Sequence, residues 1–410
     1  MIDRDHVDCI KAGCNANPAA LGMADEILIR AEVVWDLGHC SALADEWTAL
    51  DEVGLCEPST SLEWTRALLA THVADSDTVF AIVLRSQGRA VAIVPAIIRR
   101  ERVAGRLDVA TLLLLSELSG THSDILRSDD HHEIVDALFG ALAGLPCRWD
   151  ILRVSRLLES SAIAMQLSGY LGRSGLAHRF RREQPSFYLD LRQSYQQYLA
   201  TRGAKFRNYL RRKFRQFEAT GKVKVLRAGK DLAVEHAYDH LLSIEERSWK
   251  HSHGTAISAV PRQSSFYRLL CEGTSRRGRL HLMLMYLDEV PVAFNLGITT
   301  GDRYSYLKTS FDESLRRFSP ATILRAGLVE TLIAEGVHSL DFPAEPYRWE
   351  EQWTDTLRWH LSVLVFNKTP RAMLYRLLVG LRDLWRGPQG EKRVRYIDPR
   401  RLDGSVDGGA

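Results

Sequence analysis

Two similar hairpin patterns recur far apart in the chain, and this repeat constrains the fold more than any other feature. Residues 80–84 and 90–94 are apolar runs around a short turn, and residues 282–286 and 291–295 repeat the arrangement. Apolar, β-branched runs joined by a turn are typical of a β-hairpin. In each copy a strand, a helix and another strand are expected to follow. A repeated unit of this kind predicts two related domains in tandem.

The composition is that of an ordinary globular protein. Of the 410 residues 45% are hydrophobic and 26% are charged, and the net charge is only +3, so any basic binding surface must be local. The six cysteines are scattered without a CxxC pair, which predicts no metal site and no disulfide framework and favours a reducing, cytoplasmic location. No apolar run approaches the roughly 18 residues of a membrane-spanning helix.

Helices and strands alternate along the sequence, and the hairpins require antiparallel pairs, so we expect an α+β fold with mixed sheets. The predicted organisation is a loose leader over residues 1–25, a first domain over 26–191 and a second over 192–368. A C-terminal amphipathic helix and a disordered tail are expected over residues 369–410. A strongly basic helix, residues 195–220, is expected to join the two domains.

The two copies differ where the helix of each begins. In the second copy Arg316 and Arg317 precede a Ser-Pro pair at Ser319, a favourable N-cap followed by proline at the first helical position. Such a helix start attracts anions through its free amides and dipole. The counterpart begins with Asp129 and Asp130, whose charges would repel a phosphate. We therefore expect a nucleotide-like cofactor in the second domain and none in the first.

Several short motifs follow one another at characteristic spacing. They are Ser248-Trp249-Lys250, Val292-Ala293-Phe294, Tyr304-Ser305-Tyr306, Phe318-Ser319-Pro320, Leu340-Asp341-Phe342 and Glu345-Pro346-Tyr347-Arg348. Together they resemble the GNAT acyltransferase superfamily over residues 30–366. Within it they resemble the tandem-GNAT branch, with the Fem-type aminoacyl transferases and the acetyltransferases linked to cellulose and exopolysaccharide biosynthesis.

The resemblance implies two tandem GNAT-like domains and direct transfer from acetyl-CoA or another acyl-CoA to an acceptor in a ternary complex. The acceptor would be an amine or hydroxyl of a sugar, a polysaccharide precursor or another small molecule. The CoA pyrophosphate would bind Arg316, Arg317, Ser319, Ala321 and Thr322. A Ser-Pro-Ala sequence stands there in place of the glycine-rich loop common in GNAT enzymes.

Three residues are candidates for proton transfer, each with a structural alternative. Asp341 would be a general base, or a strand-end carboxylate paired with Arg348 or Lys308. Glu345 would be a second acidic group, or a solvated loop residue. Tyr347 would be the acid that protonates the CoA thiolate, or a packing tyrosine.

Four residues are candidates for binding the acceptor. Because side chains alternate along a strand, Tyr304, Tyr306 and Lys308 are expected to share one face, which would line an acceptor pocket or be partly exposed. Trp249 and Lys250 end a helix predicted over residues 232–249 and would approach the acceptor, with a core aromatic as the alternative for Trp249.

Two basic segments suggest further partners. Residues 205–215 interleave aromatic and basic side chains, which suits the RNA backbone of an aminoacyl-tRNA donor, or a helix with one apolar and one solvated face. Residues 370–385 combine leucines and arginines, which suits peripheral contact with an anionic membrane or packing on the protein's own surface or a partner. A non-catalytic binding protein is the third functional alternative, and the sequence predicts no oligomeric state.

Overall fold

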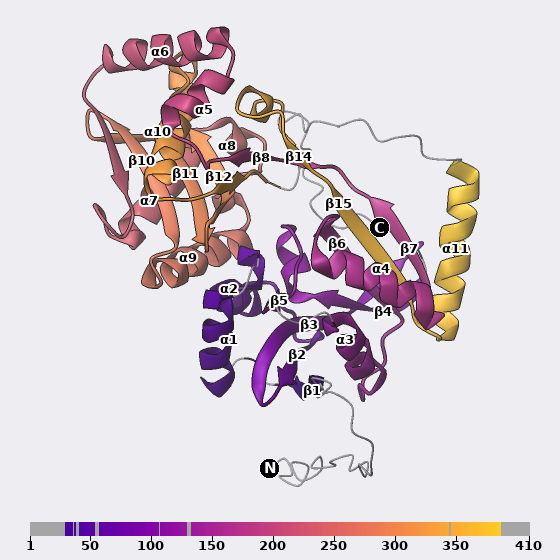
Figure 1. The fold of residues 1–410 in the computed structure, drawn as a ribbon. Helices are drawn as coiled ribbons and strands as arrows, with labels where there is room; N and C mark the ends of the chain where they lie inside the picture. The colour runs from indigo at the N-terminus through magenta and orange to yellow at the C-terminus, as the bar shows by residue number, and fades with distance from the viewer. Residues whose placement is uncertain are drawn as a thin grey trace.

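The computed structural model describes residues 29–35, 37, 41–53, 57–105, 107–128, 133–343 and 346–386. The described chain forms two mixed β-sheets, each covered by helices on both faces, which are seen as two lobes in Figure 1. The predicted α+β class is confirmed. The expected leader, and the expected tail beyond residue 386, lie outside the described residues.

The first sheet is built on the first predicted hairpin. Its strands are β1 (Ile29–Val34), β2 (Thr78–Ser86), β3 (Arg89–Val103), β4 (Leu107–Leu114), β5 (Leu126–Arg127), β6 (Ile151–Leu158), β7 (Ala177–Arg182) and β15 (His360–Phe366). The strand order is β1-β2-β3-β4-β6-β15-β7, with β5 beside β3, and only β4 and β6 pair in parallel. Helices α3 (Ile134–Ala143) and α4 (Ala162–Ser174) cover one face, and α1 (Ser41–Val53) and α2 (Leu62–Thr71) cover the other.

The second sheet repeats this plan. Its strands are β8 (Ser186–Asp190), β9 (Val223–Arg227), β10 (Leu280–Leu287), β11 (Val290–Thr300), β12 (Arg303–Phe311), β13 (Ser339–Asp341) and β14 (Leu357–Arg358), in the order β14-β8-β13-β12-β11-β10-β9. Helices α5 (Tyr195–Thr201), α6 (Ala204–Glu218) and α10 (Pro320–Ala334) cover one face, and α7 (Val234–Glu246) and α9 (Pro261–Arg276) cover the other. A short helix, α8 (Trp249–Ser252), follows α7.

The two hairpins agree in detail. Gln87 and Gly88 both have positive φ in the β2–β3 turn, and so do Asp288 and Glu289 in the β10–β11 turn, the geometry of a two-residue hairpin turn. Each hairpin also has a register shift at the same place, after Leu84 in one and after Met285 in the other. The repeat inferred from sequence is therefore a repeat of structure.

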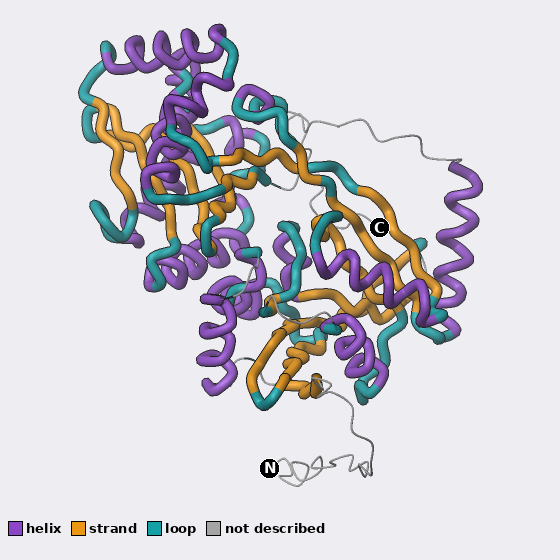
Figure 2. The backbone as a smooth tube through the Cα atoms, in the orientation of Figure 1, coloured by secondary structure: helices purple, strands orange, loops and turns teal. Residues whose placement is uncertain are grey.

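The expected boundary at residues 191 and 192 does not divide the two sheets. Strand β8 lies in the expected first domain but pairs with β13 and β14, whereas β15 lies in the expected second domain but pairs with β6 and β7. In Figures 1 and 2 the chain passes between the lobes twice, from β7 to β8 and from β14 to β15. The sheet partner of such a strand is decided by burial against residues distant in sequence, which its own local pattern does not encode. Below, the first unit and the second unit mean each sheet with its helices.

The units contact each other mainly through α2 and α9. Trp64 and Leu68 of α2 share one apolar cluster with Phe266 and Leu270 of α9. Gly273 lies at this contact, where a Cβ would come within 3.1 Å of Glu63 side-chain atoms. The predicted basic segment does not join the units, because α6 packs against α10 within the second unit. Among the described residues, no helix is long and apolar enough to span a bilayer.

Candidate functional site

Strand β12 at the centre of the second sheet pairs with the short strand β13 over only part of its length. Parallel pairing joins residues 303–305 of β12 to residues 339–341 of β13. Strand β12 then continues to Phe311 with β11 as its paired neighbour. The sheet therefore opens from Tyr306 onward, between a strand that continues and one that ends.

A bulge in β12 changes which side chains share a face. Gly297 of β11 pairs with Tyr306 and its neighbour pairs with Lys308, so Leu307 is an extra residue in β12. Gly297 is required because a Cβ would lie 2.1 Å from the Tyr304 ring. The prediction of one shared face is therefore wrong. Tyr304 and Tyr306 face α10, whereas the Lys308 ammonium lies 5.4 Å from the centre of an aromatic ring on α9.

A buried arginine of α10 lies beside the opening. Arg325 is only 4% exposed, and its guanidinium carbon lies 3.7 Å from the centre of the Trp349 ring, with the Tyr306 and Trp353 rings next to it. Its Nη2 donates to the Tyr306 hydroxyl at 3.2 Å. Aromatic faces attract a cation, and this attraction strengthens where water is excluded. The cation is thus held among rings at the point where the strands separate.

Two further polar side chains are buried around this arginine. Asn295 Oδ1 accepts hydrogen bonds from the Tyr306 hydroxyl and from the Thr309 hydroxyl, while Glu350 Oε2 accepts from the Tyr347 amide at 3.1 Å. Asn295 Nδ2 and Glu350 Oε1 have no hydrogen-bond partner within the described structure. Burial raises the pKa of Glu350 to about 8, although the Tyr347 amide and the Arg325 charge act against the rise. Buried polar atoms without partners are rare and costly, which marks this cluster as a candidate binding site.

The start of α10 is an N-terminus of unusual geometry. Ser319 is the N-cap residue, as predicted, but its φ of 59° and ψ of 50° are left-handed, and its side chain does not cap the helix. The hydroxyl instead accepts a hydrogen bond from the Tyr209 hydroxyl of α6 at 2.8 Å. Pro320 and Ala321 are buried, and the Thr322 amide donates to the Ser319 carbonyl at 3.0 Å.

The two arginines before this helix are exposed. Arg316 forms a 2.9 Å ion pair with Glu313, and the Arg317 guanidinium lies 4.5 Å from the centre of the Phe318 ring. Lys213 of α6 donates to the Arg317 carbonyl. The basic helix and the arginine pair therefore form one positively charged surface at the N-terminus of α10, a place that already favours anions.

Lysines and one carboxylate gather on the opposite face of the sheet. Glu245 of α7 is fully buried; its carboxylate accepts from Lys250 Nζ at 2.8 Å and from the Ile257 amide at 2.6 Å. Burial lowers the pKa of Lys250, and Glu245 acts against this while Lys308 adds to it. Burial also lowers the pKa of Lys308. The structure thus brings these two lysines together, while Trp249 beside them is half-buried.

Asp341 faces the first unit. Its carboxylate pairs with Arg358 and, at 3.3 Å, with Arg303, rather than with the expected Arg348 or Lys308. Burial raises the pKa of Asp341, while Arg358 and Arg303 act to lower it. Because arginines engage both of its carboxylate oxygens, Asp341 joins neighbouring strands through ion pairs and is not free to act as a proton acceptor.

The same face carries ionisable groups from both units. Arg303 also pairs with Glu57 of the first unit, whose second oxygen lies 3.8 Å from His122 Nδ1. His122 stacks on His360 with ring centres 4.4 Å apart, and His360 Nε2 lies 2.9 Å from the Ser186 hydroxyl. Burial lowers the pKa of His360 to about 3. Burial tends to raise the pKa of Glu57, but its bond to His122 and nearby positive charges lower it to about 2.

The remaining catalytic candidates divide between the described and undescribed chain. Tyr347 stacks on Trp349 with ring centres 6.3 Å apart, next to the Arg325 cluster. Glu345 lies outside the described residues. Sequence reasoning missed Asn295, Arg325 and Glu350, although an arginine inside the apolar run of α10 was an available signal.

Comparisons with known proteins agree with this fold. A family model described as the acetyltransferase (GNAT) domain matches residues 204–351. A crystal structure of FemX has 11% identity and a TM-score of 0.58, covering 82% of this chain and 98% of that chain. The C-terminal domain of a putative lysylphosphatidylglycerol synthetase from Agrobacterium fabrum has 13% identity and a TM-score of 0.50, covering 82% and 96%.

A tandem GNAT protein from the clavulanic acid biosynthesis pathway aligns at 15% identity with a TM-score of 0.46, over 83% of this chain and 100% of that chain. A search of curated protein sequences finds no match to this chain. At these identities the structural likeness concerns the fold, whereas the sequence match concerns the domain that contains the opened strands.

Proposed function

Since this chain belongs to the GNAT superfamily as a GNAT-type acyltransferase, we propose that its second unit transfers an acyl group from acyl-CoA to an acceptor amine or hydroxyl. One observation carries the proposal. The matched domain contains an opened sheet with buried polar groups, Arg325, Asn295 and Glu350, at the opening. Buried polar groups reduce stability unless they are satisfied, so their concentration at one opening favours a ligand that completes their hydrogen bonds.

The residues at the start of α10 fit a pyrophosphate in their charge. Arg316 and Arg317 are exposed, so charge-assisted hydrogen bonds to phosphate oxygens are open to both, with Arg316 exchanging its Glu313 partner for a phosphate, and Ala321 and Thr322 lie in the first turn. One feature limits the fit, because the Thr322 amide already donates to the Ser319 carbonyl. We therefore assign most of the phosphate affinity to the arginines and to the helix dipole. Bound acyl-CoA would supply the thioester from which the acyl group is transferred.

The acceptor site that we propose lies on the α7–α9 face, with Trp249, Lys250 and Lys308, and Tyr306 approaches it from the other side of the opening. Two lysines stand near one buried carboxylate, Glu245, and Lys308 has no ion-pair partner among the described residues. That surplus of positive charge favours an acceptor that carries a carboxylate or phosphate beside its reacting group. A phosphorylated saccharide precursor satisfies this requirement.

The proposed chemistry needs a proton acceptor and a proton donor. The acceptor heteroatom attacks the thioester carbonyl, the carbon–sulfur bond breaks, and the proton lost by the acceptor is balanced by the one gained by the CoA thiolate. Glu350, whose pKa burial raises to about 8, is the side chain proposed to exchange protons at neutral pH. Tyr347 is the proposed donor to the thiolate, and Asp341 is proposed to position Arg303 and Arg358 at the edge of the site.

Calorimetric titration with acetyl-CoA and with longer acyl-CoAs tests the proposal. We expect binding by the full chain, weakened about 10- to 100-fold in the double variant Arg316→Glu with Arg317→Glu, the range for loss of charge-assisted contacts. The double variant Arg30→Glu with Arg89→Glu changes the same charge at exposed sites of the first sheet and should bind as the wild type does. If no acyl-CoA binds, the proposed function is wrong.

Aminoacyl-tRNA is a second candidate donor, favoured by one observation. Helix α6 carries exposed Lys205, Arg211, Arg212 and Arg215 directly beside the start of α10. This candidate predicts tight RNA binding that falls steeply with salt, together with weak acyl-CoA binding. An RNA titration at two salt concentrations, run beside the calorimetry, separates the two donors.

A further inference from the structure

The C-terminal helix α11 (Pro370–Arg386) is apolar on two opposite sides. Its inner side packs on the first unit, where Ala372 and Val379 are buried and the Tyr375 ring centre lies 6.1 Å from that of Phe366. In Figure 1 the helix lies along the outside of that lobe, away from the second unit. Packing on the first unit therefore explains why the inner side of α11 is apolar, but it does not explain the apolar outer side.

The outer side of α11 exposes four large apolar side chains. Met373, Leu374, Leu377 and Leu381 are 54%, 47%, 59% and 54% exposed. Their spacing places them on one face of a helix with about 3.6 residues per turn. The other large apolar side chains that are exposed in the described chain are scattered one to an element. A contiguous exposed apolar stripe on a folded protein marks a surface that binds something.

Basic side chains border this stripe on both sides. By the same helical repeat, Arg376 lies along one border and Arg371 and Arg382 lie along the other, and all three are exposed. Helix α11 contains four arginines and one acidic residue, Asp383. An apolar stripe between arginine borders matches the interface of an anionic bilayer, in which leucines enter the acyl region while arginine stems extend to the headgroups.

We propose that α11 binds the protein to the surface of an anionic membrane, with the helix parallel to the bilayer plane. Charge decides against a second copy of the chain as the occupant. Two copies meeting through this stripe would bring together two helices that each carry four arginines and a single acidic residue, so like charges would repel. The proposal is independent of the acyl-transfer site, because the described side chains of α11 that are buried pack on strands of the first unit.

Vesicle co-sedimentation of the full chain tests the proposal. We expect the protein to sediment with vesicles of phosphatidylcholine and phosphatidylglycerol, to bind vesicles of phosphatidylcholine alone much less, and to dissociate as salt is raised. The double variant Leu374→Asp with Leu377→Asp should reduce binding about tenfold or more, and so should Arg376→Glu with Arg382→Glu. Met165→Asp with Val290→Asp changes two exposed apolar positions elsewhere and should bind as the wild type does.

All substituted side chains are exposed, so circular dichroism and thermal unfolding should be unchanged in each variant. Three results would overturn the proposal. They are absence of binding to the anionic vesicles, equal binding by the leucine variant, and a wild-type dimer in sedimentation analysis that the leucine variant converts to a monomer without any vesicle binding.

Discussion

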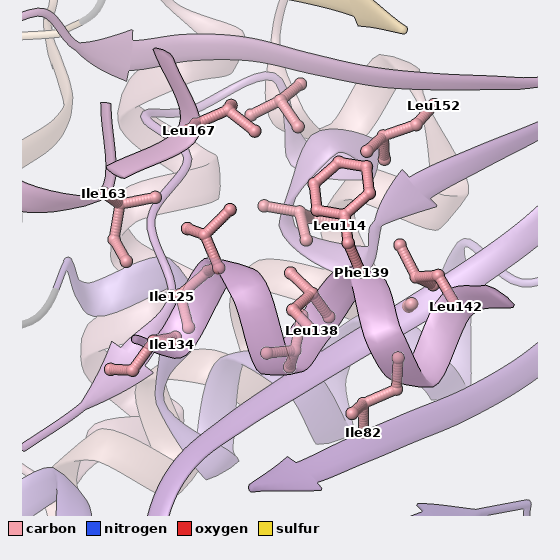
Figure 3. Close-up of a cluster of buried hydrophobic side chains, with 14 of the residues drawn as sticks. Ile82, Leu114, Ile125, Ile134, Leu138, Phe139, Leu142, Leu152, Ile163 and Leu167 are labelled. Carbon is pink, nitrogen blue, oxygen red and sulfur yellow. The ribbon is translucent and has the colours of Figure 1, made fainter. Parts of the chain in front are cut away.

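The two units share a plan but differ in what lies between sheet and helix. In the first unit, α3 and α4 cover a cluster of aliphatic side chains and Phe139, as Figure 3 shows, and this cluster surrounds a cavity of about 40 Å³. In the second unit, α10 covers the Arg325 guanidinium, the Asn295 amide and the Glu350 carboxyl. The parallel strand pair is short in both, β4 with β6 and β12 with β13.

This difference separates a stabilising core from a candidate site. Aliphatic packing maximises the apolar area removed from water, and it requires no ligand to be stable. A buried amide and carboxyl with unpartnered atoms lower stability, and proteins retain such groups mostly where they act. On this comparison, we propose that the first unit supports the fold and the second carries the chemistry.

The largest effect on stability should come from the first unit. Phe139→Ala leaves a void in the aliphatic cluster and should lower the free energy of unfolding by about 3–5 kcal/mol. Acyl-CoA affinity, measured by calorimetry below the unfolding transition, should be unchanged. A large loss of affinity in this variant would contradict the assignment of the first unit to stability alone.

Arg325→Met tests the second unit with a side chain of similar length. Loss of the hydrogen bond to the Tyr306 hydroxyl and of the contacts with Trp349 should lower the free energy of unfolding by about 1–3 kcal/mol, less than Phe139→Ala does. Acyl-CoA affinity should fall together with stability, because the cation lies at the opening of the sheet. An unchanged acyl-CoA affinity would mean that Arg325 is a core residue without a role in binding.

These contrasts show where sequence reasoning succeeds. The hairpins, their turns and most elements follow from local pattern, and α7 with α8 replaces the single helix predicted over residues 232–249 because Ser248 starts a new helix there. The exchange of β8 and β15 was not predictable, because each pairs with residues far away in sequence. The face of Lys308 was mispredicted because alternation assumes a regular strand, and the bulge at Leu307 breaks it.

The candidate site was predicted in outline only. Basic side chains lie together in two places, as their chemistry suggested. One place holds Arg316 and Arg317, and the other holds Lys250 and Lys308. Arg325 and Glu350 were missed because charged residues are expected on the surface, and only the packing of nearby aromatic rings reveals that these two are buried.

Glu350 gives the second unit a pH dependence at neutral pH, whereas burial raises the pKa of Asp124, beside the cavity of the first unit, only to about 6. The pKa of Glu350 is about 8 in the folded protein against 4.5 in the unfolded chain, so the folded state holds more protons and stability should fall as pH rises from about 4.5 to about 8. His360 acts in the opposite sense, since its pKa of about 3 makes stability fall as pH drops below 6.5. Between pH 6.5 and 8, Glu350 therefore acts without opposition from His360.

Urea unfolding of the wild type and of Glu350→Gln across that window measures the contribution. The wild type should lose stability relative to the variant, by at most about 1.4 kcal/mol per pH unit. Parallel pH profiles for the two proteins would mean that the carboxyl is ionised in the folded state and that its proposed proton exchange at neutral pH is wrong.

The smallest expected effect on stability concerns Arg316. This single side chain should contribute to acyl-CoA binding and hardly at all to stability. Its ion pair with Glu313 involves an arginine that is 60% exposed, and exposed pairs contribute only about 0–1 kcal/mol. Arg316→Ala should therefore leave the unfolding midpoint almost unchanged while it weakens acyl-CoA binding several-fold. A shift in stability without a change in affinity would make this arginine part of the scaffold and leave the start of α10 without its proposed phosphate contact.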